Sequence, residues 1–72
     1  MPKYDYSRLI GRMREKGYTQ EKMARALGIS ETSLNHRLNN RLSFKQDEIA
    51  SASNILSIPM QQIEEYFFAK HL

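Results

Sequence analysis

A glycine at position 28, set between two short amphipathic segments, constrains the fold of this chain more than any other residue. Three apolar residues precede it on one face of a helix, and Leu34 and Leu38 follow it with helical spacing. Glycine adopts the left-handed conformation that ends many helices at little steric cost. The stretch 19–40 therefore predicts two short helices joined by a tight turn.

Both predicted helices also carry start signals. Thr19 and Ser30 stand where a side-chain hydroxyl can accept a hydrogen bond from the first helical turn. An apolar residue precedes each cap and has the spacing of a hydrophobic staple. The pairs are Tyr18 with Met23 and Ile29 with Leu34. These signals predict the angle at which the chain enters each helix.

The second of these helices directs short polar side chains away from Leu34 and Leu38. At about 100° per residue, its outer face carries Thr32, His36 and Asn39, flanked by Ser33 and Asn35. Short polar groups lose little entropy on ordering and reach base edges, whereas Lys and Glu more usually fill a solvated face. An ordinary solvated face is the alternative, but the two-helix context favours recognition of DNA.

Several residues of this segment match a known pattern. They are Thr19-Gln20 at the first helix start, Ala24 where the helices cross, Leu27-Gly28-Ile29-Ser30 through the turn, and Leu34. The segment resembles the helix-turn-helix of the phage Cro and repressor family, the lambda-repressor-like DNA-binding domains. The likeness extends less sharply over nearly the whole chain, which is similar to Cro in size. It implies an all-α, compact five-helix fold.

The resemblance also implies roles for individual residues. Base contacts fall to Glu31, Thr32, Ser33 and His36, and a phosphate contact falls to Gln20. Asn35 joins the base-contacting set because it flanks the same outer face. For Glu31, stabilisation of the helix dipole is the favoured role and a contact to a cytosine amino group stays open.

Two positions depart from the family pattern. Leu38 stands where many members have an acidic residue paired to an arginine, and Met13 is its expected apolar partner here. Arg37 stands where many relatives have an apolar residue. The rotation of the recognition helix is therefore open by a fraction of a turn.

Basic and polar residues after the recognition helix predict a phosphate-binding loop. Its members are Asn39, Asn40, Arg41 and Lys45, with Gln20 on the other side. Residues 1–45 hold ten Lys and Arg against four Asp and Glu, a net charge of +6, whereas residues 46–72 have a net charge of −3 from one Lys and four acids. The basic half is thus the half with the motif, as phosphate binding requires. Arg8, Arg12, Arg14 and Lys16 are expected to supply general positive field, and Arg25 to be solvated.

Three further helices are expected. Tyr6, Leu9, Ile10 and Met13 predict one that starts near Asp5 or Ser7 and stops at Gly17. A second follows the capping-box spacing of Ser43 to Gln46 and runs to about Leu56. A third starts at Pro59 and covers about 59–69.

The last helix carries three consecutive aromatics, Tyr66, Phe67 and Phe68. Neighbours on a helix are about 100° apart, so at least one of the three is left for a partner. In the Cro and repressor family this region commonly forms a symmetric dimer, and a homodimer is expected here. A dimer would read a pseudo-palindromic operator with half-sites about 34 Å apart. The alternative is that the aromatics fold back over a small core.

Composition excludes other classes. The chain of 72 residues predicts one domain, and its zero cysteines exclude disulfides and thiolate metal sites. His36 and His71 have no suitably spaced ligands, so no metal or cofactor is expected. No catalytic motif or pocket-forming length supports an enzyme or a small-molecule substrate. Without a membrane-length apolar run or signal pattern, a cytoplasmic protein is expected.

The sequence thus predicts a repressor-like transcription regulator that binds double-stranded DNA. Two alternatives keep the same fold. One is a protein-interaction module, such as an antirepressor or adaptor, that binds through Tyr66 to Phe68. The other is an antitoxin-like partner that also regulates its own operon.

Overall fold

The computed structural model describes residues 3–70, and its regular structure is helical throughout. The elements are α1 (Ser7–Glu15), α2 (Gln20–Leu27), α3 (Glu31–Leu38), α4 (Gln46–Ile55), the 3₁₀ turn η1 (Met60–Gln62) and α5 (Ile63–Phe67). Within the described range, pairing of extended backbone is limited to an isolated bridge between Tyr4 and Lys70. The predicted all-α five-helix fold is confirmed.

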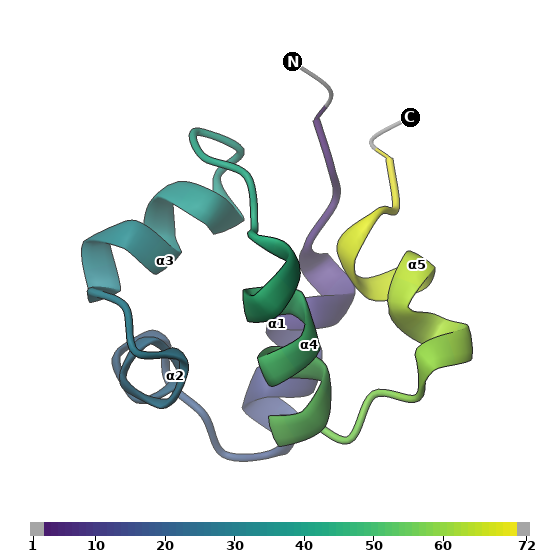
Figure 1. Ribbon diagram of the computed structural model, residues 1–72, viewed down its shortest axis with the longest axis horizontal. Coiled ribbons are helices and arrows are strands. Elements are labelled where there is room, and N and C mark those ends of the chain that lie inside the picture. The colour runs from purple at the N-terminus through teal and green to yellow at the C-terminus, as the bar shows by residue number, and fades with distance from the viewer. Residues whose placement is uncertain (1–2, 71–72) are drawn as a thin grey trace.

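The helices surround α1 and α4, which occupy the middle of the molecule (Figure 1). Helices α2 and α3 pack together at one end of the long axis, and α5 lies at the other end against α1. The bridge between Tyr4 and Lys70 brings the two ends of the chain together beside α5. Helices α2 and α3 therefore lie on the opposite side of the fold from the carboxyl-terminal helix.

One hydrophobic core joins all five helices. Its most deeply buried side chains are Phe67, Met23, Leu34 and Leu56. Phe44, in the loop before α4, contacts the rings of Tyr6 and Phe67 edge-on, with centroids 5.3 and 5.5 Å away. The amino-terminal segment and α5 are thereby packed against the same loop.

Two element boundaries refine the prediction. Helix α1 begins at Ser7 with Tyr6 at its N-cap position, and the Asp5 carboxylate accepts hydrogen bonds from the Ser7 backbone N–H at 2.9 Å and from the Ser7 hydroxyl. The predicted cap at Ser43 is wrong, since α4 begins at Gln46. Glu48 instead accepts a hydrogen bond from the Lys45 backbone N–H at 2.9 Å.

Two arginines expected to supply only general field have specific partners. Arg12, on α1, donates from Nε to the Leu56 carbonyl at 2.9 Å and from Nη2 to the Ser57 carbonyl at 3.2 Å, at the end of α4. Arg8 pairs with Glu65 at 3.4 Å and lies over the Tyr66 ring. These side chains tie α1 to α4 and to α5.

Among residues 3–70, none of the helices has the length and apolar character of a membrane span.

Candidate nucleic-acid interface

The turn between α2 and α3 has the geometry that the sequence predicts. Gly28 adopts the left-handed conformation with φ of 74°. The Ile29 N–H donates to the Ala24 carbonyl at 3.0 Å, which closes the end of α2. Ala24 and Leu34 are both buried where the two helices meet. A small side chain at position 24 therefore lets α3 approach α2 closely.

Local hydrogen bonds also fix both helix starts. The Thr19 hydroxyl accepts from the Lys22 N–H at 3.1 Å, and the Ser30 hydroxyl accepts from the Ser33 N–H at 3.0 Å. The residues before the caps, Tyr18 and Ile29, pack against the core. The two predicted caps are confirmed, and they orient α3 relative to α2.

Helix α3 presents the predicted base-contacting residues on its outer side. Glu31, Thr32 and Asn35 are exposed, and Ser33 and His36 are half-buried. Leu34, Arg37 and Leu38 form the buried side of the same helix. This burial pattern sets the rotation that the sequence leaves open. Base contact by the five outer residues stays a prediction.

The outer face of α3 is joined to α2 by a polar contact. Asn35 Nδ2 donates to Gln20 Oε1 at 3.2 Å, although the two residues lie in different helices. Asn39 Nδ2 donates to the Asn35 carbonyl at 2.8 Å, one turn further along. Gln20 and Asn35 therefore hold one another beside the surface predicted to meet DNA, one as a phosphate contact and the other as a base contact.

Arg37 is the residue whose role sequence reasoning missed. Its side chain is buried, 7% exposed, and forms a two-pronged ion pair with Glu48 of α4: Nε to Oε1 at 2.8 Å and Nη2 to Oε2 at 3.1 Å. Arg37 Nη1 also donates to the Ser33 carbonyl at 3.0 Å. The pair ties the inner side of α3 to α4. One signal in the sequence could have indicated this role: Arg37 follows the buried Leu34 by three residues and therefore lies on the inward face of α3.

The ion pair sets the protonation state of Glu48. Burial of the carboxyl acts to raise its pKa, but hydrogen bonds from Arg37 and the Lys45 backbone, with the positive charges of both residues, outweigh burial. The net pKa of Glu48 lies below its usual value. Glu48 is therefore ionised at neutral pH and keeps the Arg37 guanidinium paired.

Asn40 has a structural role in the loop after α3. Its φ is 63°, so the residue takes the conformation that glycine would otherwise supply. Its Oδ1 accepts from the Tyr4 N–H at 2.8 Å, and its Nδ2 donates to the Tyr4 carbonyl at 3.0 Å. The amide thus holds the amino-terminal segment in the manner of a paired strand. Phosphate contact by Asn40 stays a prediction, and its carboxamide is already bound to Tyr4.

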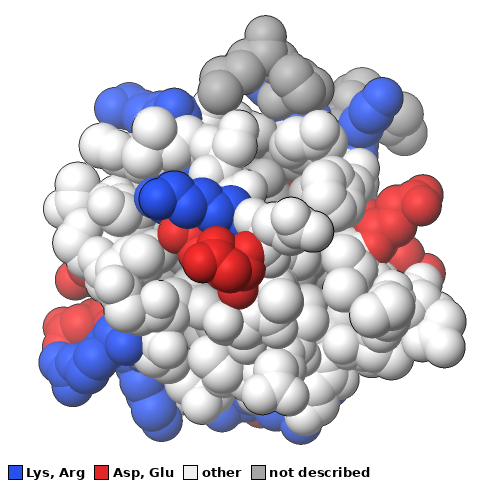
Figure 2. Space-filling view, viewed as in Figure 1, with Lys and Arg blue, Asp and Glu red and all other residues white. Residues whose placement is uncertain are grey.

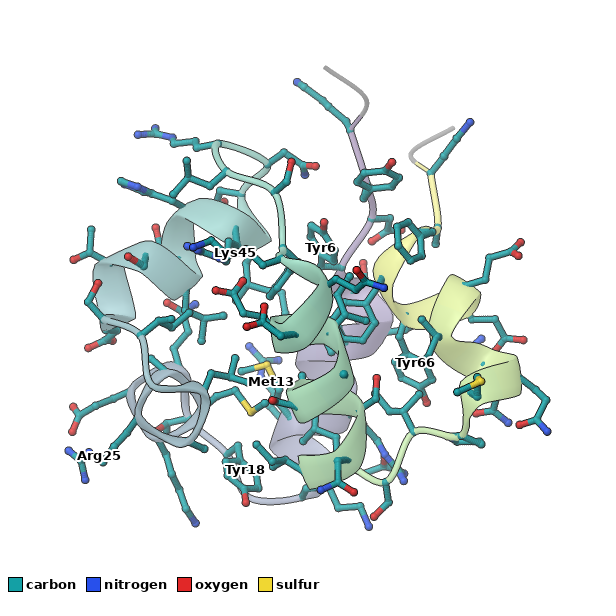
Figure 3. All side chains as sticks on the ribbon, viewed as in Figure 1. Tyr6, Met13, Tyr18, Arg25, Lys45 and Tyr66 are labelled. Carbon is teal, nitrogen blue, oxygen red and sulfur yellow. The ribbon has the colours of Figure 1, made fainter. Side chains whose placement is uncertain are left out.

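The other predicted phosphate contacts surround the carboxyl end of α3. Asn39, Arg41 and Lys45 are all exposed. Figure 3 shows Lys45 at the start of α4, with a side chain that extends toward α3 in this view, and Arg25 extending away from the body of the molecule. Arg25 is exposed and pairs with Glu21 of its own helix at 3.2 Å. The loop cations therefore lie near the face of α3 that is predicted to meet DNA, whereas Arg25 is a surface residue with a local partner.

Apolar packing is found at the positions where the sequence resemblance would otherwise imply an ion pair. Met13 and Leu38 are both buried in the common core. They also line one depression together with Ile10 and Gln20. The end of α3 is therefore held to α1 by apolar burial, as the sequence predicts.

The three carboxyl-terminal aromatics have different environments. Tyr66 and Phe67 are buried in the core of the single chain, and their assignment to a dimer interface stays a prediction. Both face inward because α5 packs across α1. Phe68 is 44% exposed and is the member of the trio that remains at the surface. His71 lies outside the described residues.

Comparison with known proteins places the fold in a family. No curated protein matches the chain. A solved structure does: the solution structure of the modulator of repression (MOR) of the temperate bacteriophage TP901-1 from Lactococcus lactis. The match has 43% sequence identity, covers 90% of this chain and 88% of that chain, and has a TM-score of 0.77. The family model described as "Protein of unknown function (DUF739)" matches residues 2–70, and the chain therefore belongs to the DUF739 family.

Proposed function

We propose that this protein is a sequence-specific DNA-binding regulator that places α3 in the major groove of an operator. The observation that carries the proposal is the two-sided character of α3. Its inner side is fixed by Leu34 and by the buried pair of Arg37 with Glu48, while Thr32 and Asn35 remain exposed. A rigid helix with exposed, short polar groups is suited to reading base edges.

The surroundings of α3 support the same function. Gln20 lies at the start of α2, and Arg41 and Lys45 lie beyond the other end of α3, so backbone contacts would flank the reading surface. The similar phage protein is named a modulator of repression, and we propose that this chain likewise regulates transcription in a phage. Such a regulator would act in the cytoplasm, where the DNA is. A homodimer on a pseudo-palindromic operator stays a prediction.

Salt dependence of DNA binding tests the phosphate contacts. Fluorescence anisotropy on labelled duplex DNA should give a linear fall of log affinity with log salt concentration. Arg41→Ala should reduce that slope by about 1, because one phosphate charge is no longer neutralised. Arg25→Ala is the matched control, since that side chain pairs with Glu21 and should not change the slope. Equal slopes for wild type and Arg41→Ala would contradict the assignment of the loop.

A protein-binding adaptor is the second candidate function. It is favoured by the exposed Met60 and Phe68, and the name of the similar phage protein fits an antirepressor as well as a DNA reader. An antitoxin-like partner would use the same fold. An adaptor that does not bind DNA would show neither a sequence footprint nor a steep salt dependence.

A further inference from the structure

An exposed apolar surface lies at the end of the molecule that is remote from α3. Met60, Ile63, Glu64 and Phe68 line a shallow depression of about 520 Å³, and we call these four residues the α5 patch. Met60 is 82% exposed. Contiguous apolar surface of this kind marks interaction sites more often than scattered single residues do.

The α5 patch combines a fixed anchor with an adaptable side chain. The Phe68 ring contacts the Tyr4 ring edge-on at a centroid distance of 5.8 Å, and its backbone N–H donates to the Glu64 carbonyl at 3.0 Å. Phe68 nevertheless remains exposed. Met60 has an unbranched, polarisable side chain that adapts to the shape of a partner. A rigid aromatic beside a flexible thioether is suited to holding apolar side chains.

Charge identifies what kind of partner fits. Glu64 is exposed within the patch and has no ion pair among residues 3–70, and Glu65 beside it pairs with Arg8 at the surface. Figure 2 shows acidic side chains at the edge formed by α5. An apolar surface with an acidic rim attracts a segment with apolar side chains flanked by Lys or Arg.

The same charges oppose a second copy of this chain. In a two-fold interface each patch meets its own equivalent, so Glu64 of one copy would be brought into the same small contact as Glu64 of the other. Like charges in such a contact disfavour association. A standard interface also uses about 20–30 residues a side, many more than the four that form the patch.

We propose that the α5 patch binds a short amphipathic segment of another protein, apolar on one face and basic at its edges. Because α3 and α5 lie on opposite sides of the fold, the segment can bind while α3 is occupied by DNA (Figure 1). The assignment holds whether or not α3 reads DNA, so the two proposals fail separately.

The test measures binding of two labelled synthetic helical peptides to the full chain in the absence of DNA. Both peptides carry the same leucine stripe, and one has lysines at the edges where the other has glutamates. The lysine peptide should bind at least about tenfold more tightly. Non-specific attraction to a protein of net charge +3 would favour the glutamate peptide, so this order is diagnostic.

Substitutions locate the site of binding. Met60→Ser should weaken binding of the lysine peptide by about tenfold or more, and Glu64→Lys should reverse the preference between the peptides. Leu42→Ser is the control, because Leu42 is also an exposed large apolar residue, 45% exposed, and lies outside the patch. Circular dichroism checks that each variant is folded.

Three outcomes would overturn the proposal. The first is failure of both peptides to bind the folded wild-type protein. The second is an equal loss of binding with Met60→Ser and Leu42→Ser. The third is sedimentation of the wild-type protein as a dimer that Met60→Ser dissociates, which would assign the patch to a second copy.

Discussion

The buried pair of Arg37 with Glu48 provides the sharpest test of how α3 is held. Glu48→Gln removes the negative charge but keeps a side-chain oxygen that can accept the hydrogen bond from the Lys45 N–H. The guanidinium of Arg37 then stays buried without a counter-charge. Breaking a buried pair from one side costs about 3–5 kcal/mol.

That loss is large for a domain of this size. A chain of 72 residues has a total stability of roughly 4–11 kcal/mol, at about 0.05–0.15 kcal/mol per residue. Each kcal/mol corresponds to about 4–8 °C in Tm for a small domain. Glu48→Gln should therefore lower Tm by about 12 °C or more. The double variant Arg37→Met with Glu48→Gln should recover part of the loss, because the stranded charge is gone.

Urea denaturation followed by circular dichroism measures these free energies of unfolding. The control is Glu21→Gln, which breaks the exposed pair with Arg25 and should cost less than about 1 kcal/mol. If Glu48→Gln destabilises the protein no more than Glu21→Gln does, the pair is not a buried anchor and the account of α3 is wrong.

Three further predictions concern stability. The folded-state pKa of Glu48 lies below its unfolded value, so its contribution to stability is fully present above the unfolded pKa and is lost as pH falls through the folded pKa. The urea midpoint, measured as a function of pH, should show this loss in wild type but not in Glu48→Gln. Gly28→Ala should cost about 1–2 kcal/mol because the φ of Gly28 is 74°. Gly11→Ala, in the middle of α1 where an added Cβ meets nothing, should instead stabilise the protein by up to about 1 kcal/mol. Thermal melts compare the two variants, and equal Tm shifts would contradict the turn geometry. Asn40→Gly permits the same positive φ but removes both hydrogen bonds to the Tyr4 backbone, so it should cost about 1–3 kcal/mol. Hydrogen exchange of the Tyr4 amide should accelerate in this variant, and unchanged exchange would contradict the structural role of Asn40.

Features that depend on neighbours in the sequence were predictable. The caps at Thr19 and Ser30 and the turn at Gly28 each rest on hydrogen bonds within five residues, so their signals are local. The apolar spacing around Leu34 likewise predicted which side of α3 faces the core. These elements together specify α2, α3 and the turn between them.

Features that depend on distant partners were not predictable. Glu48 lies 11 residues from Arg37 in another helix, and nothing local indicates that the two charges are buried together. Asn40 is hydrogen-bonded to Tyr4, 36 positions away in the sequence. The residues around Asn40 do not distinguish an exposed loop residue from one that is hydrogen-bonded to a distant segment. Of the three adjacent aromatics, only packing against α1 decides that Phe67 is buried and Phe68 is exposed.

Our proposal that α3 reads DNA sequence can be tested by a binding selection from random duplex DNA. Purified wild-type protein is compared at near-physiological salt with a variant in which Thr32 and His36 are both alanine. Both residues lie outside the core, so the variant should fold. Wild type should enrich a sequence motif that the variant does not enrich. A folded wild-type protein that enriches no sequence, or a variant that enriches the same motif, would contradict the proposal.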